Sequence, residues 1–274
     1  MIGKLDLPRV ERPDHGKDGV ETMAMTPIVQ INAIPIANVS MDEALDRIDG
    51  AIERREKRCV FFVNADCVNI TAKDPRYLRV LQRSDAWVFG DGLGIRIAAR
   101  ISRQPVKDNV NGTDMFPRLC QRCAANGRSI FLIGAKPGVA EEVKRRMEAL
   151  QPGLMVAGTE HGYHEASQWG EVVERVNASK AEVVLVAFGA PKQEMWIAEH
   201  REALDASVAM GVGGLFDFCS GRVPRAPKVV RKASLEWAWR LAIEPRRLWR
   251  RYVIGNFRFM GRVVWWELRR MRER

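Results

Sequence analysis

Several carboxylate, amide and lysine side chains in this sequence directly follow apolar runs that are typical of buried strands. Asp91 lies between Gly90 and Gly92, just after the apolar run that ends at Phe89. A carboxylate held at a strand end by a tight loop is suited to general-base catalysis, in which it removes a proton from a reacting hydroxyl. Asp66, at the end of another apolar run, is the competing carboxylate. The alternative role for Asp91 is to cap the next helix.

A second set of polar side chains follows the apolar run at residues 183–188. Lys192, Gln193 and Glu194 come after a Gly-Pro loop. Gln193 has no evident capping role, which favours a ligand contact, whereas Glu194 either bonds ribose hydroxyls or opens its helix. The carboxyl ends of parallel strands meet at one edge of a sheet, where open α/β sheets bind ligands. We therefore expect a binding site at that edge, with candidates Asn64, Asp66, Asp91, Gly92, Thr113, Asp114, Gly134, Lys192, Gln193, Glu194 and Gly213.

The apolar runs alternate with segments of helical periodicity. This order predicts an α/β fold, with a Rossmann-like, mostly parallel sheet and helices on its faces. Residues 28–40 alternate between apolar and polar, as an edge strand or hairpin does. Ser40 followed by Glu43 forms a capping box for the next helix, and Thr113 or Asp114 is expected to cap a later one.

The basic excess of the chain is confined to residues 222–274. These residues carry 16 Lys and Arg against 4 Asp and Glu, whereas the other 221 residues carry 28 Lys and Arg against 30 Asp and Glu. They also contain five of the eight Trp. The expected organisation is therefore a flexible polar extension at 1–27 and an α/β catalytic core at 28–221. A basic, Trp-rich helical appendage at 222–274 completes the chain.

The appendage has the pattern of basic amphipathic helices. Pro245 suits the first position of a helix and Gly255 can end it, and arginines gather on one side while apolar residues gather on the other. Helices of this kind bind anionic membrane interfaces. Two alternatives remain open: the apolar side packs on the core, or the basic side binds nucleic acid. The scarcity of lysine argues against nucleic acid.

A glycine-containing loop at residues 131–143 is typical of nucleotide binding. Gly134 and Gly138 follow an apolar run, and glycines there let a diphosphate approach backbone N–H groups at a helix N-terminus. The spacing is less specific than GxGxxG. A nucleotide-binding oxidoreductase of Rossmann type is one hypothesis that this loop supports.

Several classes of protein and site are not expected. No run of 18 apolar residues is present, which predicts no transmembrane helix, and the N-terminus lacks the apolar region of a secretory signal. Five cysteines suit a reducing compartment, and Cys120 and Cys123 are interpreted as small apolar residues on a helix. The histidines lack metal-ligand spacing and there is no Asp-x-Asp motif, so we expect no metal and no cofactor.

Long motifs in one order give the chain a more specific resemblance. The sequence resembles the WecG/TagA/CpsF family of bacterial glycosyltransferases (glycosyltransferase family 26) over about residues 30–260. The motifs that carry the resemblance are FVNADCVNI, GDGLGI, VNGTDMFPRLC, FLIGAKPGVAEEV, GAPKQEMWI and the segment from GVGGLFDFCSGRVPRAPK to RRLWRRY. The polar extension before residue 28 departs from the family core.

The resemblance implies an activity. It implies inverting, metal-independent transfer of a hexosyl residue from a UDP-sugar onto a sugar linked through diphosphate to a polyprenol. The sugar moved is of the N-acetylmannosamine type or glucose, in surface polysaccharide biosynthesis. An enzyme with these partners is expected in the cytoplasm, peripheral on the inner face of the cell membrane. The donor sugar, the acceptor sugar and linkage, the pathway and the oligomeric state stay open.

The resemblance also implies roles for individual residues. Asp91 matches the proposed general base, Asn64 a pocket residue and Gln193 a contact on the UDP side. Three arginines of the appendage match residues that close over the diphosphates: Arg240, Arg247 and Arg250.

Overall fold

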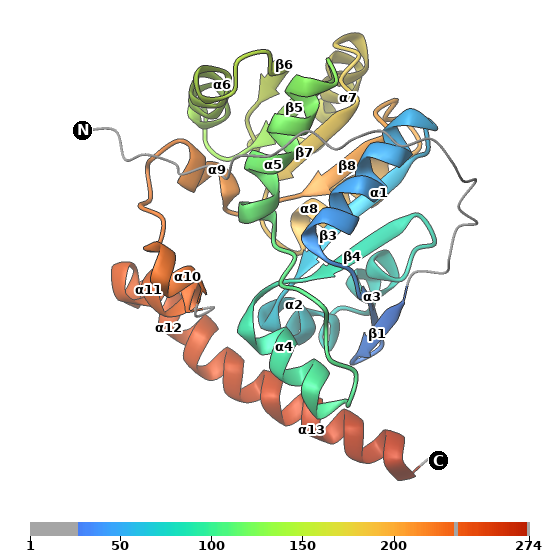
Figure 1. Ribbon diagram of the computed structural model, residues 1–274, viewed down its shortest axis with the longest axis vertical. Coiled ribbons are helices and arrows are strands. Elements are labelled where there is room, and N and C mark those ends of the chain that lie inside the picture. The colour runs from blue at the N-terminus through green and yellow to red at the C-terminus, as the bar shows by residue number, and fades with distance from the viewer. Residues whose placement is uncertain (1–26, 233–234, 273–274) are drawn as a thin grey trace, which may run out of the picture.

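The apolar runs pair as parallel strands of one six-stranded sheet in the computed structural model, which describes residues 27–232 and 235–272 (Figure 1). All neighbouring strands of this sheet are parallel, which confirms the predicted α/β fold. Residues 1–26 of the expected N-terminal extension lie outside the described residues. Across the sheet the order is β4 (Ala86–Gly90), β3 (Arg58–Val63), β8 (Val208–Gly211), β7 (Val183–Ala187), β5 (Ser129–Gly134) and β6 (Met155–Glu160).

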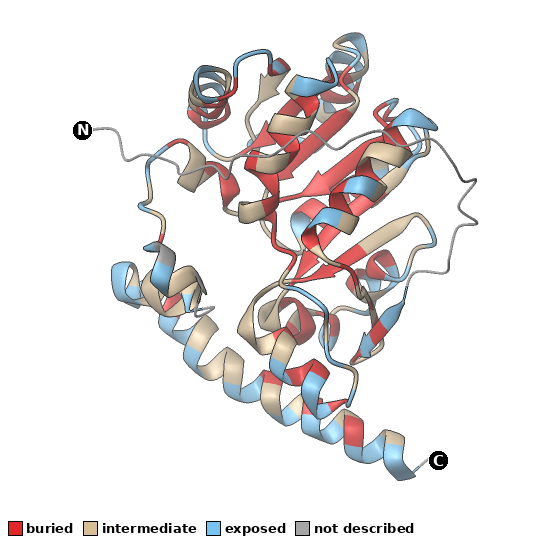
Figure 2. Ribbon diagram, viewed as in Figure 1, coloured by how far each residue is buried: buried red, intermediate tan, exposed pale blue. Residues whose placement is uncertain are grey.

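Helices cover both faces of the sheet, because the side chains of each strand alternate between two apolar cores. In β3, Val60 and Phe62 join one core, while Phe61 and Val63 join the other. Both cores are buried (Figure 2). The first face is covered by α1 (Met41–Glu53), α5 (Gly112–Ala125), α6 (Val139–Leu150) and α9 (Leu215–Cys219). The second is covered by α2 (Ala65–Thr71), α3 (Pro75–Leu81), α4 (Gly92–Ile101), α7 (Trp169–Ala178) and α8 (Lys192–His200).

A separate hairpin precedes the sheet, as the alternation at 28–40 predicts. Strands β1 (Ile28–Ile31) and β2 (Ile34–Ala37) pair antiparallel. The turn residues Asn32 and Ala33 both have positive φ, which suits the twist of a two-residue hairpin turn. The inward residues of both strands are buried in the second core, so the hairpin extends that core beside β4.

Two helix starts test the capping expectations. The Ser40 hydroxyl accepts a hydrogen bond from the Glu43 N–H at 3.2 Å, and the Glu43 carboxylate accepts one from the Ser40 N–H at 2.7 Å. The predicted capping box is therefore confirmed. The expectation that Thr113 or Asp114 caps α5 is wrong, because Asn111 occupies the cap and its Oδ1 accepts from the Asp114 N–H at 2.8 Å.

The appendage forms a chain of helices that ends in one long helix. Pro245 begins a helix, as predicted, but Gly255 does not end it. Gly255 has a helical φ of −59° and the chain continues without a break. The reason is packing, since the next turns dock on α2 and α4 (Figure 1). The elements are α10 (Lys228–Lys232), α11 (Glu236–Ile243), α12 (Pro245–Trp249), the wider-turned π-helix η2 (Arg250–Ile254) and α13 (Gly255–Arg272).

Helix α13 joins the appendage to the core. Phe259 and Val263 are each 1% exposed and belong to the second core. The Glu267 carboxylate accepts a hydrogen bond from the Ser102 hydroxyl at 2.7 Å. Part of the apolar side therefore packs on the core, which is one of the alternatives that the sequence leaves open. Another part faces outward, since Phe257 is 77% exposed.

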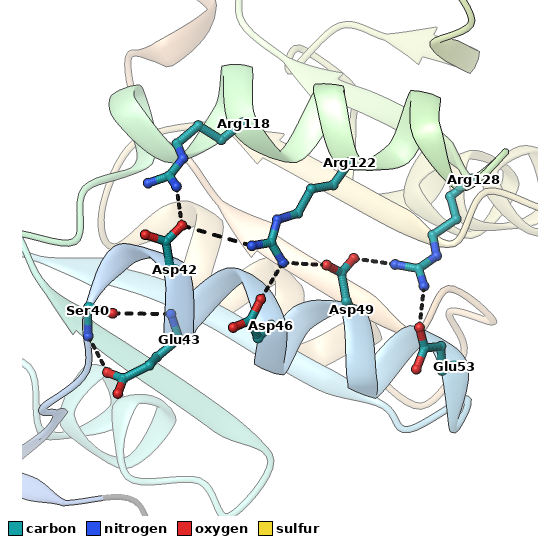
Figure 3. A network of polar contacts seen from close by, with 9 residues as sticks. All are labelled: Ser40, Asp42, Glu43, Asp46, Asp49, Glu53, Arg118, Arg122 and Arg128. Atoms are coloured by element: carbon teal, nitrogen blue, oxygen red, sulfur yellow. Dashed lines mark hydrogen bonds and ion pairs between the residues drawn. The ribbon is translucent and has the colours of Figure 1, made fainter. Parts of the chain in front are cut away.

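A ladder of ion pairs joins α1 to α5 and to Arg128, which lies just before β5 (Figure 3). Arg122 bonds Asp46 and Asp49, each at 2.6 Å, and Arg128 bonds Asp49 and Glu53. Only 9% of the Arg128 side chain is exposed. An ion pair shielded from water retains more of its attraction than a solvated one, so the buried end of the ladder should matter most to stability.

The two ends of this ladder lead to a stability prediction. Arg128→Met should lower the free energy of unfolding by about 2 kcal/mol, because charge-assisted hydrogen bonds of a buried guanidinium are lost. The matched control is Arg118→Met, whose partner Asp42 is largely exposed; it should cost less than about 1 kcal/mol. Urea unfolding measures both values. Equal losses in the two variants would contradict this account.

Candidate active site

A cavity of about 320 Å³ lies where the carboxyl ends of β3 and β4 meet the appendage. Its core wall comes from the starts of α2, α4 and α5 and from the loop before α5. Its other wall comes from α10, α11, η2 and α13. The polar and charged lining residues are Asn64, Asp66, Asp91, Asn109, Asn111, Thr113, Asp114, Arg231, Glu236, Arg240, Arg251, Tyr252 and Asn256. We call this space the Asp91 cavity.

Asp91 reaches the cavity because β4 delivers it to the start of α4. Its backbone N–H donates to the Val63 carbonyl at 2.8 Å, which extends the pairing of β4 with β3 by one residue. Asp91 occupies the N-cap position of α4, yet its side chain makes no capping hydrogen bond. The alternative role of Asp91 as a helix-capping side chain is therefore wrong. The Gly92 N–H donates instead to Asn109 Oδ1 at 2.6 Å.

The electrostatic surroundings suit Asp91 to proton transfer near neutral pH. Burial of the Asp91 carboxyl, reinforced by the negative charges of Glu236 and Asp114, raises its pKa to about 7. Arg240 and Arg251 partly offset that shift. A general base is most effective when its pKa lies near the working pH. Two of these four charges, those of Glu236 and Arg240, come from α11 of the appendage.

Asn64 and Asp66 line the same cavity from the start of α2. Asn64 is the N-cap of α2, and its Oδ1 accepts hydrogen bonds from the N–H groups of Asp66 at 3.0 Å and Cys67 at 3.3 Å. Asp66 forms an ion pair with Arg251 of η2 at 2.9 Å. Asp66 is thus already paired with a cation, which makes it a weaker candidate for the base than Asp91.

Thr113 and Asp114 lie on the first turn of α5, on the same core wall of the cavity. Asp114 bonds Arg225 and lies 3.5 Å from Arg231, so it ties the core to the appendage. Burial opposes ionisation of Asp114, but hydrogen bonding from Asn111 and the charges of both arginines outweigh it and hold its pKa below the usual range.

The appendage arginines fall in different places. Arg240 lines the cavity, with its guanidinium 5.1 Å from the Phe218 ring centre and near Gly214. Arg250 is exposed and lies over the ring of Trp249. The side chain of Arg247 lies outside the described residues. Arg251, which the resemblance does not single out, lines the cavity instead.

The residues that follow β7 lie beneath the loops rather than in the Asp91 cavity. Gln193 is 4% exposed, and its Oε1 accepts from the N–H groups of Gly189 at 3.1 Å and Gly213 at 2.8 Å. Its Nε2 donates to Glu194 at 2.9 Å. Gln193 therefore braces the loops after β7 and β8 against each other. Burial raises the pKa of Glu194 to about 7, and Lys192 is exposed.

Gly134 ends β5, away from the lining of the Asp91 cavity. Its φ of +134° and the position of a Cβ, which would lie 2.6 Å from the Ala187 carbonyl oxygen, both require glycine. Gly92 and Gly213 also have positive φ, but a Cβ at either would meet no atom within 4 Å. Their backbones therefore face open space beside the cavity and the β8 loop.

Comparison with known proteins identifies the family of this chain. The sequence profile of the glycosyl transferase WecG/TagA/CpsF family matches residues 29–273. The chain belongs to this family. It is therefore a glycosyltransferase, and neither the oxidoreductase nor the nucleic-acid hypothesis is supported.

One characterised relative and one solved structure illustrate the range of similarity. The N-acetylglucosaminyldiphosphoundecaprenol N-acetyl-beta-D-mannosaminyltransferase of Bacillus spizizenii is 35% identical over 179 residues, which cover 65% of this chain and 68% of the relative. A nicotinate phosphoribosyltransferase from Vibrio cholerae is 13% identical, with a TM-score of 0.23 over 72% of this chain and 49% of that one. Similarity at that level carries no argument.

Sequence patterns do not predict several of the residues that line the Asp91 cavity of this glycosyltransferase. Asn109 lies in a loop without a strand-end pattern, and Glu236 lies at the start of a tail helix whose position over the core depends on tertiary packing. Arg251 sits among other arginines and is distinguished only by the wider π-helical turn that carries it. Such turns often occur at functional sites, but nothing in the local sequence predicts this one.

The raised pKa of Asp91 leads to a prediction about stability. Since the unfolded pKa is about 4 and the folded value about 7, the folded state loses stability as pH rises through this window. Asp91→Asn should therefore raise the free energy of unfolding, more at pH 8 than at pH 5. Thermal and urea unfolding at both pH values measure the effect.

Asp114→Asn provides the control of opposite sign. The lowered pKa of Asp114 contributes stability above about pH 4 that is lost as pH falls. This variant should be less stable than the parent at both pH 5 and pH 8. An Asp91→Asn protein destabilised to the same degree would show that the carboxylate of Asp91 holds the fold together, contrary to our interpretation.

Proposed function

We propose that this glycosyltransferase moves a hexosyl residue from a UDP-sugar to a sugar linked through diphosphate to a polyprenol, in surface polysaccharide biosynthesis. N-acetylmannosamine is the first candidate donor sugar, because the Bacillus relative is named for that sugar and for an undecaprenol-linked N-acetylglucosamine acceptor. Glucose is the second. The observation that carries the proposal is the Asp91 carboxylate, which makes no capping bond and has a pKa of about 7, in a cavity lined by arginines.

In the proposed reaction Asp91 acts as the general base. Its carboxylate accepts the proton of the acceptor hydroxyl while that oxygen forms a bond to the anomeric carbon of the donor. The bond from the anomeric carbon to the diphosphate breaks, and UDP leaves with the electron pair. One displacement from the opposite side inverts the configuration at that carbon. The protonated Asp91 returns its proton to solvent after the products leave.

Arginines and backbone N–H groups are proposed to stabilise the departing diphosphate. Arg231, Arg240 and Arg251 line the cavity, and guanidinium groups bind phosphate oxygens in a bidentate manner. The Gly213 N–H already donates to Gln193 Oε1 at 2.8 Å, so the groups proposed for this role are the arginines and the backbone of the neighbouring Gly214, which lies near Arg240. Donors preorganised where charge develops lower the barrier to departure, so these groups can act without a metal ion.

We also infer that the appendage holds the enzyme at an anionic membrane surface, where a polyprenol-linked acceptor resides. Apolar side chains of η2 and α13 face outward, including Val253, Phe257 and Trp265, and Arg258 on the same helix is exposed. Exposed apolar and basic groups together favour an interfacial position. In the described part of the chain, no helix has the length and apolar character needed to cross a bilayer.

The activity test is UDP release in the presence of EDTA, with a panel of UDP-sugars and two acceptors. The acceptors are polyprenyl-diphosphate-linked N-acetylglucosamine and its glucose-linked counterpart. We expect release with UDP-N-acetylmannosamine and the first acceptor. The absence of turnover with any pair, in detergent and in liposomes, would contradict the proposed function.

Asp91→Asn should lower kcat by about 10²- to 10⁴-fold, the range for loss of a general base, and leave the affinity for UDP within about threefold of the parent. Asp66→Asn is the matched control at the neighbouring strand end and should retain most of the activity. If Asp66→Asn abolishes turnover and Asp91→Asn does not, the assignment of the base is reversed.

A further inference from the structure

A second cavity, of about 280 Å³, lies between the end of α4 and the last turns of α13. Its apolar lining comes from Ile101 on α4 and from Val264, Leu268 and Met271 on α13. These side chains are between 37% and 59% exposed. Apolar side chains that remain exposed along a groove mark a binding site for an apolar ligand or surface.

This second cavity continues the Asp91 cavity along the same two helices. Ile97 lines the Asp91 cavity, and Ile101 lines the second cavity one helical turn later. On α13, Met260 lines the first and Val264 the second, again one turn later. Residues four apart lie on one face of a helix. Apolar side chains therefore continue along both helices from the Asp91 cavity to the second cavity, and we call this stripe with the second cavity the α4–α13 groove.

The length and charge of the groove suit an extended hydrocarbon chain. From Met260 to Met271 the helix rises about 16 Å at 1.5 Å per residue. Glu267 is the acidic residue in the lining; it pairs with Arg270 at 3.0 Å and accepts a hydrogen bond from the Ser102 hydroxyl at 2.7 Å. Arg103 also lines the cavity and is exposed, so an apolar chain can lie over the apolar side chains while the Arg103 guanidinium stays in water.

We propose that the α4–α13 groove binds the first isoprene units of the polyprenyl-diphosphate acceptor. This inference rests on the proposed function, because the groove begins beside the cavity in which the diphosphate-linked sugar of that acceptor is proposed to react. The isoprenoid chain is covalently attached to that sugar, so it has to leave the Asp91 cavity by some route. The α4–α13 groove provides an apolar route, which begins at Ile97 and Met260 and ends at Met271.

Direct binding of two soluble probes tests the groove independently of turnover. Geranyl diphosphate has two isoprene units and geranylgeranyl diphosphate has four, and calorimetry below their aggregation limits gives both Kd values. The full chain should bind the longer probe at least tenfold more tightly. The single variant Val264→Ser should reduce this preference. The double variant, Ile101→Ser combined with Val264→Ser, should bring the two Kd values to within about twofold of each other. Equal Kd values in the parent protein would overturn the proposal.

Phe257→Ser is the matched control, because Phe257 lies on the same helix, is 77% exposed and does not line either cavity. It should keep the chain-length preference and lose affinity for vesicles of anionic phospholipid. Loss of the preference in this variant as well would mean that the probes bind a general apolar surface, and would overturn the groove. A probe-induced dimer in light scattering would assign the groove to a second copy instead. Failure of sugar transfer with the preference intact would count against the proposed function alone.

A second inference concerns Asn109 and its hydrogen bond at the start of α4. The N–H of Gly92 opens α4 and donates to Asn109 Oδ1 at 2.6 Å, although the adjacent Asp91 side chain occupies the N-cap position. The preceding residue, Asp108, is itself anchored, since it accepts from the Met41 N–H at 3.1 Å and from the Asn109 N–H at 2.7 Å. The Asn109 amide is thus held at the helix start by a fixed loop.

We infer that Asn109 is a positioning residue that keeps the Asp91 carboxylate free for proton transfer. An aspartate at an N-cap normally accepts the N–H of the second or third helical residue, here Leu93 or Gly94, and such bonds favour its ionised form and lower its pKa. By fixing the Gly92 N–H, Asn109 holds the start of α4 in the geometry in which the Asp91 side chain makes no capping bond. The other charges that face Asp91 are Glu236 and Arg240 of α11, Asp114 of α5 and Arg251 of η2.

The pH dependence of kcat/KM tests this role, which also rests on Asp91 being the base. Asn109→Ala should move the acidic limb of the profile to lower pH by about one unit and reduce kcat at pH 8 at least tenfold. Asn109→Asp keeps an acceptor oxygen and adds a negative charge, so its limb should move to higher pH, with kcat at pH 9 largely restored. If Asn109→Ala loses activity but the acidic limb of its pH profile does not move, Asn109 has only a structural role. If the pH profile of the residual activity of Asp91→Asn keeps its acidic limb, Asp91 is not the group that titrates. The roles of both Asp91 and Asn109 would then be contradicted.

Discussion

The proposed chemistry of this enzyme depends on one carboxylate that makes no capping bond at the start of a helix. The positive end of a helix attracts negative charge, and Asp91 stands where that attraction is normally used for capping. Its side chain nevertheless makes no capping bond, and the Gly92 N–H is taken by Asn109. Burial and the charges of Glu236 and Asp114 then raise its pKa to about 7. The fold therefore forgoes a stabilising contact and holds at the cavity a carboxyl group whose pKa suits the role of general base proposed for it.

Closure of the cavity by the appendage follows from how α13 is attached. Phe259 and Val263 bury one side of that helix in the second core, and the contact of Glu267 with Ser102 fixes its later turns. This attachment carries α11 and η2 to the mouth of the cavity, where they contribute Glu236, Arg240 and Arg251. The appendage thus forms part of the site in addition to presenting an apolar surface to the exterior.

The sequence predicts the sheet, most helices and the place of Asp91, because strand burial and strand-to-loop transitions are local patterns. It does not predict which candidates meet. Asn64, Asp66, Asp91 and Asp114 share a cavity, whereas Gln193 turns inward to brace two loops. Whether a side chain faces a ligand or the loop beneath it depends on strand order. The continuation of the helix through Gly255 also depends on tertiary contacts, since packing on α2 and α4 outweighs a local stop signal.

The measurement that tests the central claim most directly is a carbon-13 NMR titration of the aspartate carboxyl groups in the full chain, with Asp91→Asn to assign the Asp91 signal. The structure predicts a midpoint of about 7 for Asp91, well above the usual range for aspartate of about 3.5 to 4. A midpoint in that usual range would show that the Asp91 carboxylate is capped or solvated in solution. The interpretation of Asp91 as a base tuned by burial and by the appendage would then be contradicted.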